Sequence, residues 1–212
     1  MVEAVNTILL VDDHPLLRKG VSQLLDLEDD LKVIGEASNG ADAVSMATEL
    51  DPDLILLDLS MRGMDGIETL AAMRDADISA HIVVFTVSDD RADVIAALKA
   101  GADGYLLKDV EPDYLVASIQ QACSGKMVLS DQLTEILASS FRDNENTKDL
   151  GALTRRELQI LKYIAEGLSN KLIARKLDIA ESTVKVHVKH LLKKLGFRSR
   201  VEAAVWMVEQ QK

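Results

Sequence analysis

Asp53-Leu54-Ile55-Leu56-Leu57-Asp58-Leu59-Ser60 is the stretch that decides the fold of this chain. Its apolar run is short enough to be one fully buried strand of a parallel sheet, with Asp58 at the carboxyl end. In an open α/β sheet, that edge is where ligands bind. A second apolar run, residues 8–11, also ends in acids, Asp12 and Asp13. We therefore expect three carboxylates to converge on one crevice.

Three carboxylates this close together repel one another unless a cation joins them. Oxygen ligands of this kind suit a hard divalent ion, so the sequence predicts a Mg²⁺ site. The alternative is two solvated acidic loops, which we expect less because each acid follows a buried strand. His14 stands beside the aspartates, but carboxylate oxygen sites do not call for imidazole, and we expect a loop residue there.

The charge of the 212-residue chain is distributed unevenly, which favours two domains over one. Residues 1–124 carry 24 Asp and Glu against 8 Lys and Arg, whereas residues 153–212 carry 6 against 13. Only the second part could face nucleic acid. Cys123 is the only cysteine, so no internal disulfide can form, which is typical of a reducing cytosol. No apolar run reaches roughly 18 residues, so we expect a soluble cytoplasmic protein without membrane insertion.

The first 124 residues alternate between strand-like and helix-like periodicity. Expected strands cover residues 8–11, 32–36, 54–58, 81–86 and 104–107. Expected helices cover residues 15–27, 39–50, 65–74, 90–100 and 111–123. Five such units predict an α/β doubly wound parallel sheet with helices on both faces.

Two more polar residues fall at the carboxyl ends of expected strands, Thr86 and Lys108. Both would reach the acidic crevice. A nucleophilic carboxylate, a metal ion, a hydroxyl donor and an ammonium group together suit the receipt of a phosphoryl group. Phosphoryl transfer depends mostly on positioning and charge neutralisation, which Mg²⁺ and Lys108 could supply.

Residues 6–124 resemble the receiver domains of bacterial two-component response regulators. The likeness rests on Asp12-Asp13, on Asp58 followed by Gly63-Met64-Asp65-Gly66, on Thr86, and on Gly101-Ala102-Asp103-Gly104-Tyr105-Leu106-Leu107-Lys108. It implies a flavodoxin-like fold with a five-stranded parallel sheet, and a sensor histidine kinase as the phosphate donor.

The resemblance also implies a role for each matching residue. Asp58 is then the phosphoacceptor, and Thr86 and Lys108 hold the phosphoryl oxygens. The implied ligands of Mg²⁺ are Asp13, Asp58 and the backbone carbonyl of Ser60, with Asp12 acting through water. Tyr105 matches the family's switch aromatic, which turns inward when the threonine moves.

The C-terminal part reads as four short helices after a linker. Capping boxes start helices at Thr154 and Ser199, and the expected helices cover residues 154–166, 169–177, 181–195 and 199–208. The linker, residues 125–149, contains a short amphipathic helix that Ser130 can cap, with Leu133, Ile136 and Leu137 on one face. We therefore expect a receiver domain at 1–124 and an all-α DNA-binding domain at 150–212.

The third of these helices has an apolar back and a cationic front. Val184, Val188, Leu191 and Leu195 form the apolar stripe, and Lys185, Val186, Lys189 and Lys193 lie on neighbouring faces. A helix of this kind can lie in the DNA major groove. Lys171 and Arg175, on the preceding helix, would contact phosphates.

Residues 153–204 closely resemble the LuxR-type helix-turn-helix, through Leu168-Ser169-Asn170-Lys171 and Thr183-Val184-Lys185-Val186-His187-Val188. The likeness is strongest to nitrate/nitrite-responding members, which implies control of nitrate/nitrite respiration genes. It implies that Lys185, Val186 and Lys189 face bases of promoter DNA. The terminal helix, with Val201, Val205 and Trp206, would support a homodimer on DNA. Ala180 departs from the usual Ser or Thr cap.

Two other classes of function compete with a phosphorylation-controlled regulator that is not an enzyme. A Mg²⁺-dependent phosphohydrolase of haloacid dehalogenase type also uses a strand-end aspartate, but it needs a second aspartate where Ser60 stands. A small-molecule-gated LuxR-type regulator would need an apolar cavity instead of an acidic crevice. Phosphorylation by a small phosphodonor with Mg²⁺ separates the three.

Overall fold

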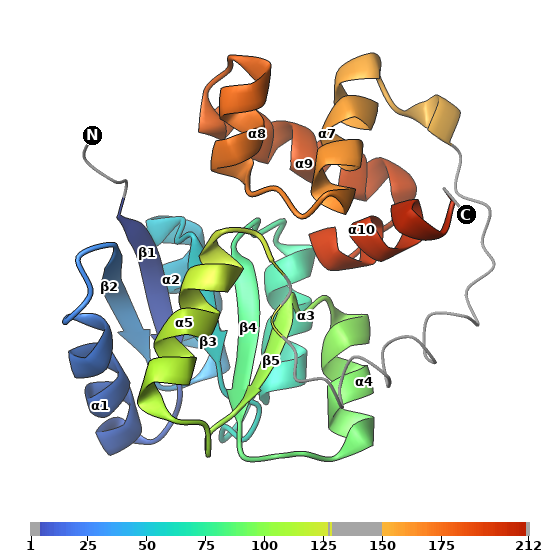
Figure 1. Cartoon of the computed structure of the whole chain (residues 1–212). Coiled ribbons are helices and arrows are strands. Elements are labelled where there is room, and N and C mark those ends of the chain that lie inside the picture. Colours follow the sequence, from blue (N-terminus) through green and yellow to red (C-terminus); the bar gives the residue numbers. More distant parts are fainter. Residues whose placement is uncertain (1–4, 127, 129–149, 211–212) are drawn as a thin grey trace.

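The structure is a computed structural model that describes residues 5–126, 128 and 150–210 (Figure 1). The expected linker helix with Leu133, Ile136 and Leu137 lies outside the described residues. No helix in the described ranges is long and apolar enough to cross a membrane.

A five-stranded parallel sheet forms the core of the N-terminal part. Its strands are β1 (Asn6–Val11), β2 (Leu31–Ala37), β3 (Leu54–Leu57), β4 (His81–Thr86) and β5 (Gly104–Leu107), in the order β2-β1-β3-β4-β5. This order confirms the predicted doubly wound fold. Successive side chains of β1 and β3 enter different apolar clusters, Leu9 and Ile55 on one face and Ile8 and Leu54 on the other. Both faces are therefore buried, as the continuous apolar runs predict.

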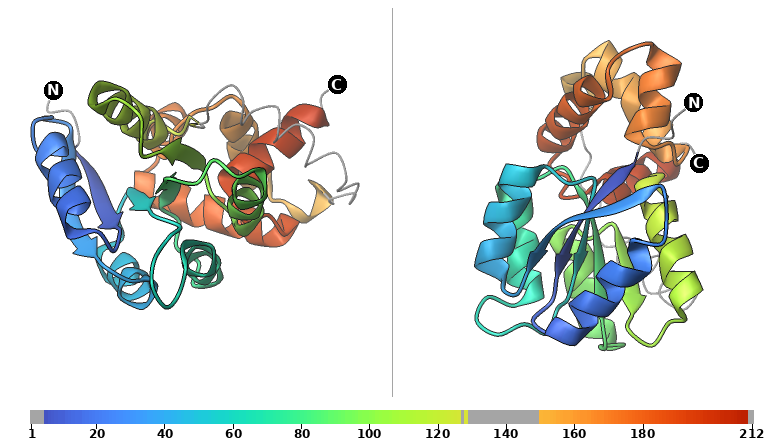
Figure 2. Two further views of the ribbon diagram at one scale, coloured as in Figure 1. Left: turned by 90° about the horizontal axis from the view of Figure 1, so that it is seen from below. Right: turned by 90° about the vertical axis from the view of Figure 1, so that its left-hand side faces the viewer.

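Helices cover both faces of the sheet, as the views in Figure 2 show. They are α1 (Pro15–Leu25), α2 (Gly40–Leu50), α3 (Gly66–Asp75), α4 (Arg91–Ala100) and α5 (Pro112–Cys123). Helices α1 and α5 pack in one apolar cluster, and α2, α3 and α4 pack in the other. The first helix ends two residues earlier than predicted, because Leu27 is exposed instead of facing the core. Val128 pairs with β5, so the receiver's packing extends beyond the expected boundary at residue 124.

The C-terminal part contains the four expected helices. They are α7 (Arg155–Ala165), α8 (Asn170–Leu177), α9 (Glu181–Leu195) and α10 (Arg200–Glu209), after a 3-10 turn η1 (Leu150–Ala152). Their apolar faces form a cluster separate from the two receiver clusters. The stripe of Val184, Val188, Leu191 and Leu195 is buried in it, which confirms the predicted orientation of α9.

The capping box predicted at Thr154 forms, and the one predicted at Ser199 forms only in part. The capping box of Thr154 and Glu157 has both of its hydrogen bonds. At Ser199 only the forward bond forms, because the Glu202 carboxylate accepts from the backbone N–H of Arg198 instead. Ala180 caps α9 without a side-chain hydrogen bond. Asp178 does not replace it, since it ends α8 in the left-handed conformation.

The C-terminal helices lie against the amino ends of the receiver strands (Figure 1). Lys185 of α9 pairs with Asp53, which precedes β3, and Lys189 pairs with Asp77, which precedes β4. The carboxyl ends of the same strands lie at the opposite end of the sheet. The contact between the two parts and the acidic crevice are therefore a full strand length apart.

Candidate phosphoacceptor site and nucleic-acid interface

The three predicted carboxylates converge at the carboxyl ends of β1 and β3. Ligand atoms of Asp12, Asp13 and Asp58, together with one from His14, all lie within 4.8 Å of one another. Parallel strands bring these acids together because β1 and β3 are direct neighbours in register, Val11 opposite Leu57. The predicted crevice is confirmed as a cluster of carboxylates, and Asp58 is its most buried member, with 1% of its surface exposed.

Lys108 enters the same cluster from the end of β5. Its ammonium lies 2.7 Å from Asp12 Oδ2 and 2.7 Å from Asp58 Oδ2, and it is almost fully buried. The backbone N–H of Lys108 donates to the carbonyl of Thr86 at 2.8 Å, so β4 holds the lysine in place. Thr86 itself is fully buried at the end of β4. The structure therefore brings Lys108 to Asp58, as predicted, with Thr86 at the neighbouring strand end.

The donor set fits a divalent cation. Among the described residues, the three buried or half-buried carboxylates are met by one ammonium, that of Lys108, which contacts Asp12 and Asp58. One positive charge against three carboxylates leaves the cluster negative, and a divalent cation with oxygen ligands would neutralise it. The backbone N–H of Ser60 donates to Asp58 Oδ1 at 3.2 Å, which orients the carboxylate.

Gly66 is required where α3 begins beside Asp58. A Cβ at this position would clash with the carbonyl oxygen of Asp58 and with the Cα of Leu59. The backbone N–H of Gly66 donates to the carbonyl of Leu59 at 3.0 Å. This close approach explains the glycine of the Gly63-Met64-Asp65-Gly66 motif and fixes the loop that follows Asp58.

Tyr105 is buried between β5 and the loop after β4. Its hydroxyl donates to the backbone carbonyl of Ser88 at 2.8 Å, and its surface is 1% exposed. Burial, with a smaller effect of the Asp93 carboxylate, raises the pKa of this hydroxyl to about 12. The aromatic ring is thus already inside, in contact with the loop that follows Thr86.

His14 lies at this site although we expected an ordinary loop residue. Its ring Nδ1 is 2.9 Å from Asp13 Oδ1 and 3.2 Å from Asp12 Oδ1. His14 is the N-cap residue of α1, yet its side chain makes no capping hydrogen bond. The sequence signal that could have found it is the direct adjacency of a histidine to two site aspartates.

The predicted nucleic-acid face of α9 and α8 is turned toward the receiver. Lys185 lies 3.4 Å from Asp53 and 3.9 Å from Asp51, and Lys189 lies 3.2 Å from Asp77. Val186 remains 51% exposed. Two cavities flank this contact, one of about 320 Å³ and one of about 350 Å³.

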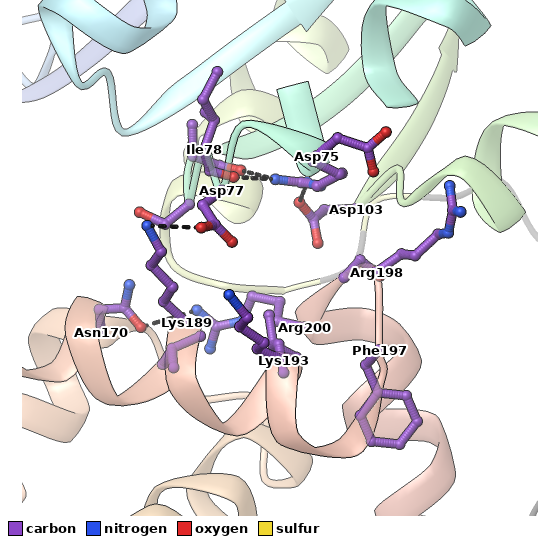
Figure 3. A pocket seen from close by; sticks show the side chains of 16 residues that line it. Asp75, Asp77, Ile78, Asp103, Asn170, Lys189, Lys193, Phe197, Arg198 and Arg200 are labelled. Carbon is purple, nitrogen blue, oxygen red and sulfur yellow. Dashed lines mark hydrogen bonds and ion pairs between the residues drawn. The ribbon is translucent and has the colours of Figure 1, made fainter. Parts of the chain in front are cut away.

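Figure 3 shows the smaller cavity, which lies between the two parts of the chain. Lys189 and Lys193 of α9 and Arg198, which lies between α9 and α10, line it from the C-terminal part, and Asp77 and Asp103 line it from the receiver. The larger cavity is lined by Lys171 and Arg175 of α8 and by Lys185, among others. All of the residues expected to contact DNA except Val186 therefore line these two cavities, and acids of the receiver line them from the other side.

Two buried cationic side chains hold the edges of this contact. Arg74 donates to Asp103 Oδ2 at 2.6 Å and to the carbonyls of Ile78 and Ala80, which fixes the loop before β4. Arg200 donates to the carbonyl of Leu168, which fixes the start of α8 against α10.

Next to them lies His81, the first residue of β4, which is buried. Burial lowers the pKa of His81 to about 4, with a further lowering by the charge of Arg200.

The residues expected to support dimerisation lie on α10. Val201 is buried within this single chain, and the Trp206 ring packs against Phe197 with centroids 5.5 Å apart. The side chain of Val205 lies outside the described residues.

Two protein families match the chain along most of its length. Residues 8–120 match the response regulator receiver domain, and residues 151–207 match the bacterial regulatory proteins of the luxR family. The nitrate/nitrite response regulator protein NarL of Escherichia coli (strain K12) is 58% identical over 207 residues, which are 97% of this chain and 96% of that protein. These matches support neither the phosphohydrolase nor the small-molecule-gated alternative.

Solved structures give the same result. The response regulator ChrA of a heme-sensing two-component system is 34% identical, with a TM-score of 0.53 and 98% of both chains covered. A structure of two RcsB dimers bound to two parallel DNAs is 25% identical, with a TM-score of 0.57, and the match covers 96% of this chain and 98% of that one.

Proposed function

The chain belongs to the two-component response regulators that join a receiver domain to a LuxR-type DNA-binding domain, and from this we propose that phosphorylation of Asp58 controls its binding to promoter DNA. The observation that carries the proposal is the buried Asp58 carboxylate, which Lys108 contacts at the edge of a five-stranded parallel sheet. The phosphoryl donor is a phosphohistidine of a sensor histidine kinase. The action belongs in the cytoplasm, because promoter DNA lies there.

The proposed transfer breaks the N–P bond of the phosphohistidine and forms an O–P bond to a carboxylate oxygen of Asp58. Asp12, Asp13, Asp58 and the carbonyl of Ser60 would hold Mg²⁺, which when bound neutralises charge on the transferring phosphoryl group. Lys108 is within reach of Asp58 and supplies a second positive charge there. Thr86 would donate its hydroxyl to a phosphoryl oxygen.

The proposed switch connects this site to Tyr105. The Thr86 hydroxyl now accepts weakly from the backbone N–H of Ser88, at 3.4 Å, and Tyr105 donates to the carbonyl of the same residue. A hydroxyl drawn toward a phosphoryl group would leave Ser88, and the loop that holds Tyr105 would shift with it.

The domain division we propose is a receiver at 1–124, a linker at 125–149 and a DNA-binding domain at 150–212. Separate apolar clusters in the two parts support it. Contacts of Val128 with β5 favour a receiver that is a few residues longer. A homodimer on DNA, formed through Val201, Val205 and Trp206, would require α10 to expose Val201, which is buried here.

Asp58→Asn tests the acceptor. The asparagine amide cannot form the acyl phosphate, so incubation with acetyl phosphate and Mg²⁺ should give no phosphorylated species by intact-protein mass spectrometry. Asp109→Asn is the matched control, since Asp109 is exposed and this substitution removes the same charge. Undiminished labelling of Asp58→Asn would refute the assignment.

The signal we propose is nitrate or nitrite, by similarity to the Escherichia coli relative whose name states it. Phosphotransfer from a purified nitrate-sensing histidine kinase to this chain should be faster than from a kinase of unrelated signal. Equal rates from both kinases would contradict the proposed signal and leave the acceptor assignment standing.

A further inference from the structure

Arg18, near the start of α1, folds its side chain back toward the end of β1. Its Nη1 atom donates to the backbone carbonyl of Asp12 at 2.5 Å, and its Nε atom lies 3.4 Å from Glu36 Oε2 near the end of β2. The Arg18 side chain is 16% exposed. Asp12, Arg18 and Asp58 also line one hollow of about 10 Å³. Arg18 is therefore a neighbour of both the acidic loop and the phosphoacceptor, although the proposed transfer does not use it.

The bond from Arg18 to Asp12 restrains more than one atom. The carbonyl of Asp12 belongs to the peptide that joins Asp12 to Asp13, and a peptide unit is planar. A donor that holds the carbonyl oxygen therefore also restrains the N–H and the Cα of Asp13. The backbone N–H of Asp12 donates to the carbonyl of Ala37 at 3.1 Å, so β2 holds the preceding peptide in the same way. Arg18 thus sets the direction in which the Asp13 side chain leaves the backbone.

Asp13 needs this restraint more than the other two acids do. The carboxylates of Asp12 and Asp58 contact the ammonium of Lys108, whose side chain is 9% exposed. The carboxylate of Asp13 contacts the ring of His14, whose side chain is 67% exposed. An exposed contact of this kind contributes little to holding a side chain in place. The position of the Asp13 carboxylate therefore depends on how its backbone is held.

Position outweighs charge in the effect that we expect of Arg18. The guanidinium contacts a carbonyl oxygen and does not occupy a carboxylate oxygen of the cluster, and the Glu36 carboxylate partly compensates its charge. Residues that orient metal ligands in this way typically change metal affinity by about 10- to 100-fold when they are removed.

We propose that Arg18 is a positioning residue of the phosphoacceptor site, which holds the peptide between Asp12 and Asp13 so that the Asp13 carboxylate can bind the cation. This inference rests on the proposed function, because that function assigns Asp13 to the Mg²⁺ site.

Metal affinity without phosphorylation provides the first test. Unphosphorylated full-length protein is titrated calorimetrically with Mg²⁺ for the wild type, Arg18→Ala, Arg18→Lys and Lys19→Ala. Arg18→Ala should weaken Mg²⁺ binding by about tenfold or more. Arg18→Lys should recover most of this loss, since its ammonium can donate to the same carbonyl. Lys19 is exposed on the same helix, and Lys19→Ala, which removes the same charge, should change the affinity by less than about twofold.

The Mg²⁺ dependence of phosphorylation separates positioning from a general loss of structure. Labelling by acetyl phosphate is followed at increasing Mg²⁺ by intact-protein mass spectrometry, at a temperature well below the unfolding midpoint of every variant. In Arg18→Ala, the Mg²⁺ concentration for the half-maximal rate should rise about tenfold. The rate at saturating Mg²⁺ should stay within about twofold of the wild type, because Arg18 contacts a backbone carbonyl and not the carboxylate that accepts phosphate. A loss of structure would instead reduce the amount of protein that reacts at every Mg²⁺ concentration.

The outcomes separate this inference from the proposed function. Equal Mg²⁺ affinity in wild type and Arg18→Ala, or equal weakening by Lys19→Ala, would overturn the role of Arg18 and leave the phosphoacceptor assignment standing. If Arg18→Ala does not fold, Arg18→Met keeps the apolar stem, removes the donor and should show the same loss of affinity. Absence of any Mg²⁺ binding by the wild type would instead refute the proposed cation site itself.

Discussion

The Glu157 carboxylate joins two helices of the DNA-binding domain through an ion pair that is buried on its acidic side. It is 3% exposed, closes the capping box of α7 through Thr154, and lies 2.7 Å from the ammonium of Lys194 on α9. Burial raises the pKa of Glu157, but the Lys194 ammonium and the bonds from Thr154 outweigh it and lower the pKa to about 2. The carboxylate is therefore charged in the folded domain at all ordinary pH values.

Glu157→Gln should destabilise the DNA-binding domain by about 1 to 2 kcal/mol at pH 7, because it removes a charged hydrogen bond and weakens a cap. Urea unfolding followed by the fluorescence of Trp206, the only tryptophan, measures this domain directly. Because the pKa of Glu157 is lower in the folded domain than its ordinary value of 4.5, the charged carboxylate stabilises the domain above pH 4.5. This stabilisation is lost as the pH falls from 4.5 toward 2. The difference between variant and wild type should therefore shrink below pH 4.5, and a difference that does not change with pH would contradict this prediction.

His81 gives a pH dependence in the same direction, but at higher pH, to the arrangement seen here, in which the receiver's Asp53 and Asp77 pair with Lys185 and Lys189 and which we call the closed arrangement. Its pKa is lowered to about 4, so a state in which His81 is freed binds a proton that the present state does not. Stability is complete above the ordinary value of 6.5 and is lost as pH falls from there toward 4. Between pH 7.5 and 5 we expect the midpoint of thermal unfolding to fall more for wild type than for His81→Gln. Parallel curves for the two proteins would contradict it.

At the scale of elements, α9 presents two lysines to the position where a DNA major groove would lie. Lysines near the start of a groove-lying helix can reach guanine acceptors, so Lys185 should discriminate sequence. Lys185→Ala should lose about 1 to 3 kcal/mol on the specific site and much less on random DNA. The measurement compares both DNAs at one salt concentration, with the phosphorylated protein. Equal losses on the two DNAs would show that Lys185 contacts only phosphates.

The strands and helices could be predicted where the local sequence pattern alone decides them. Buried parallel strands such as β3 are continuous apolar runs. Residues at the carboxyl ends of such strands, among them Asp58 and Lys108, meet at one edge of the sheet, so their proximity could be predicted as well. The direction of a polar side chain was harder to predict, because several groups close to it in the sequence compete for it. The Glu202 carboxylate accepts from the backbone N–H of Arg198 instead of closing the capping box at Ser199, and the His14 ring turns to Asp12 and Asp13.

At the scale of the whole molecule, the acidic residues 1–124 and the basic residues 153–212 attract each other, but charge alone does not say which of their surfaces meet. The contact lies at the amino ends of the strands, where Asp51, Asp53 and Asp77 face Lys185 and Lys189. The same lysines are those we expect to face DNA. Acids of the receiver therefore occupy the positions that DNA would need, and the closed arrangement competes with DNA for one surface.

Competition of this kind predicts the effect of removing the receiver's acids. Asp51→Asn, Asp53→Asn and Asp77→Asn combined should weaken the closed arrangement, since each exposed ion pair contributes up to about 1 kcal/mol. The unphosphorylated full-length variant should then bind target DNA at least about threefold more tightly than wild type at moderate salt. Asp26→Asn, Asp29→Asn and Asp109→Asn combined remove the same charge from exposed positions away from the contact and form the control. If receiver dimerisation alone controls DNA binding, the two triple variants should bind DNA equally well, because neither changes the phosphoacceptor. A gain in affinity that is confined to the first triple variant requires a receiver that covers α9.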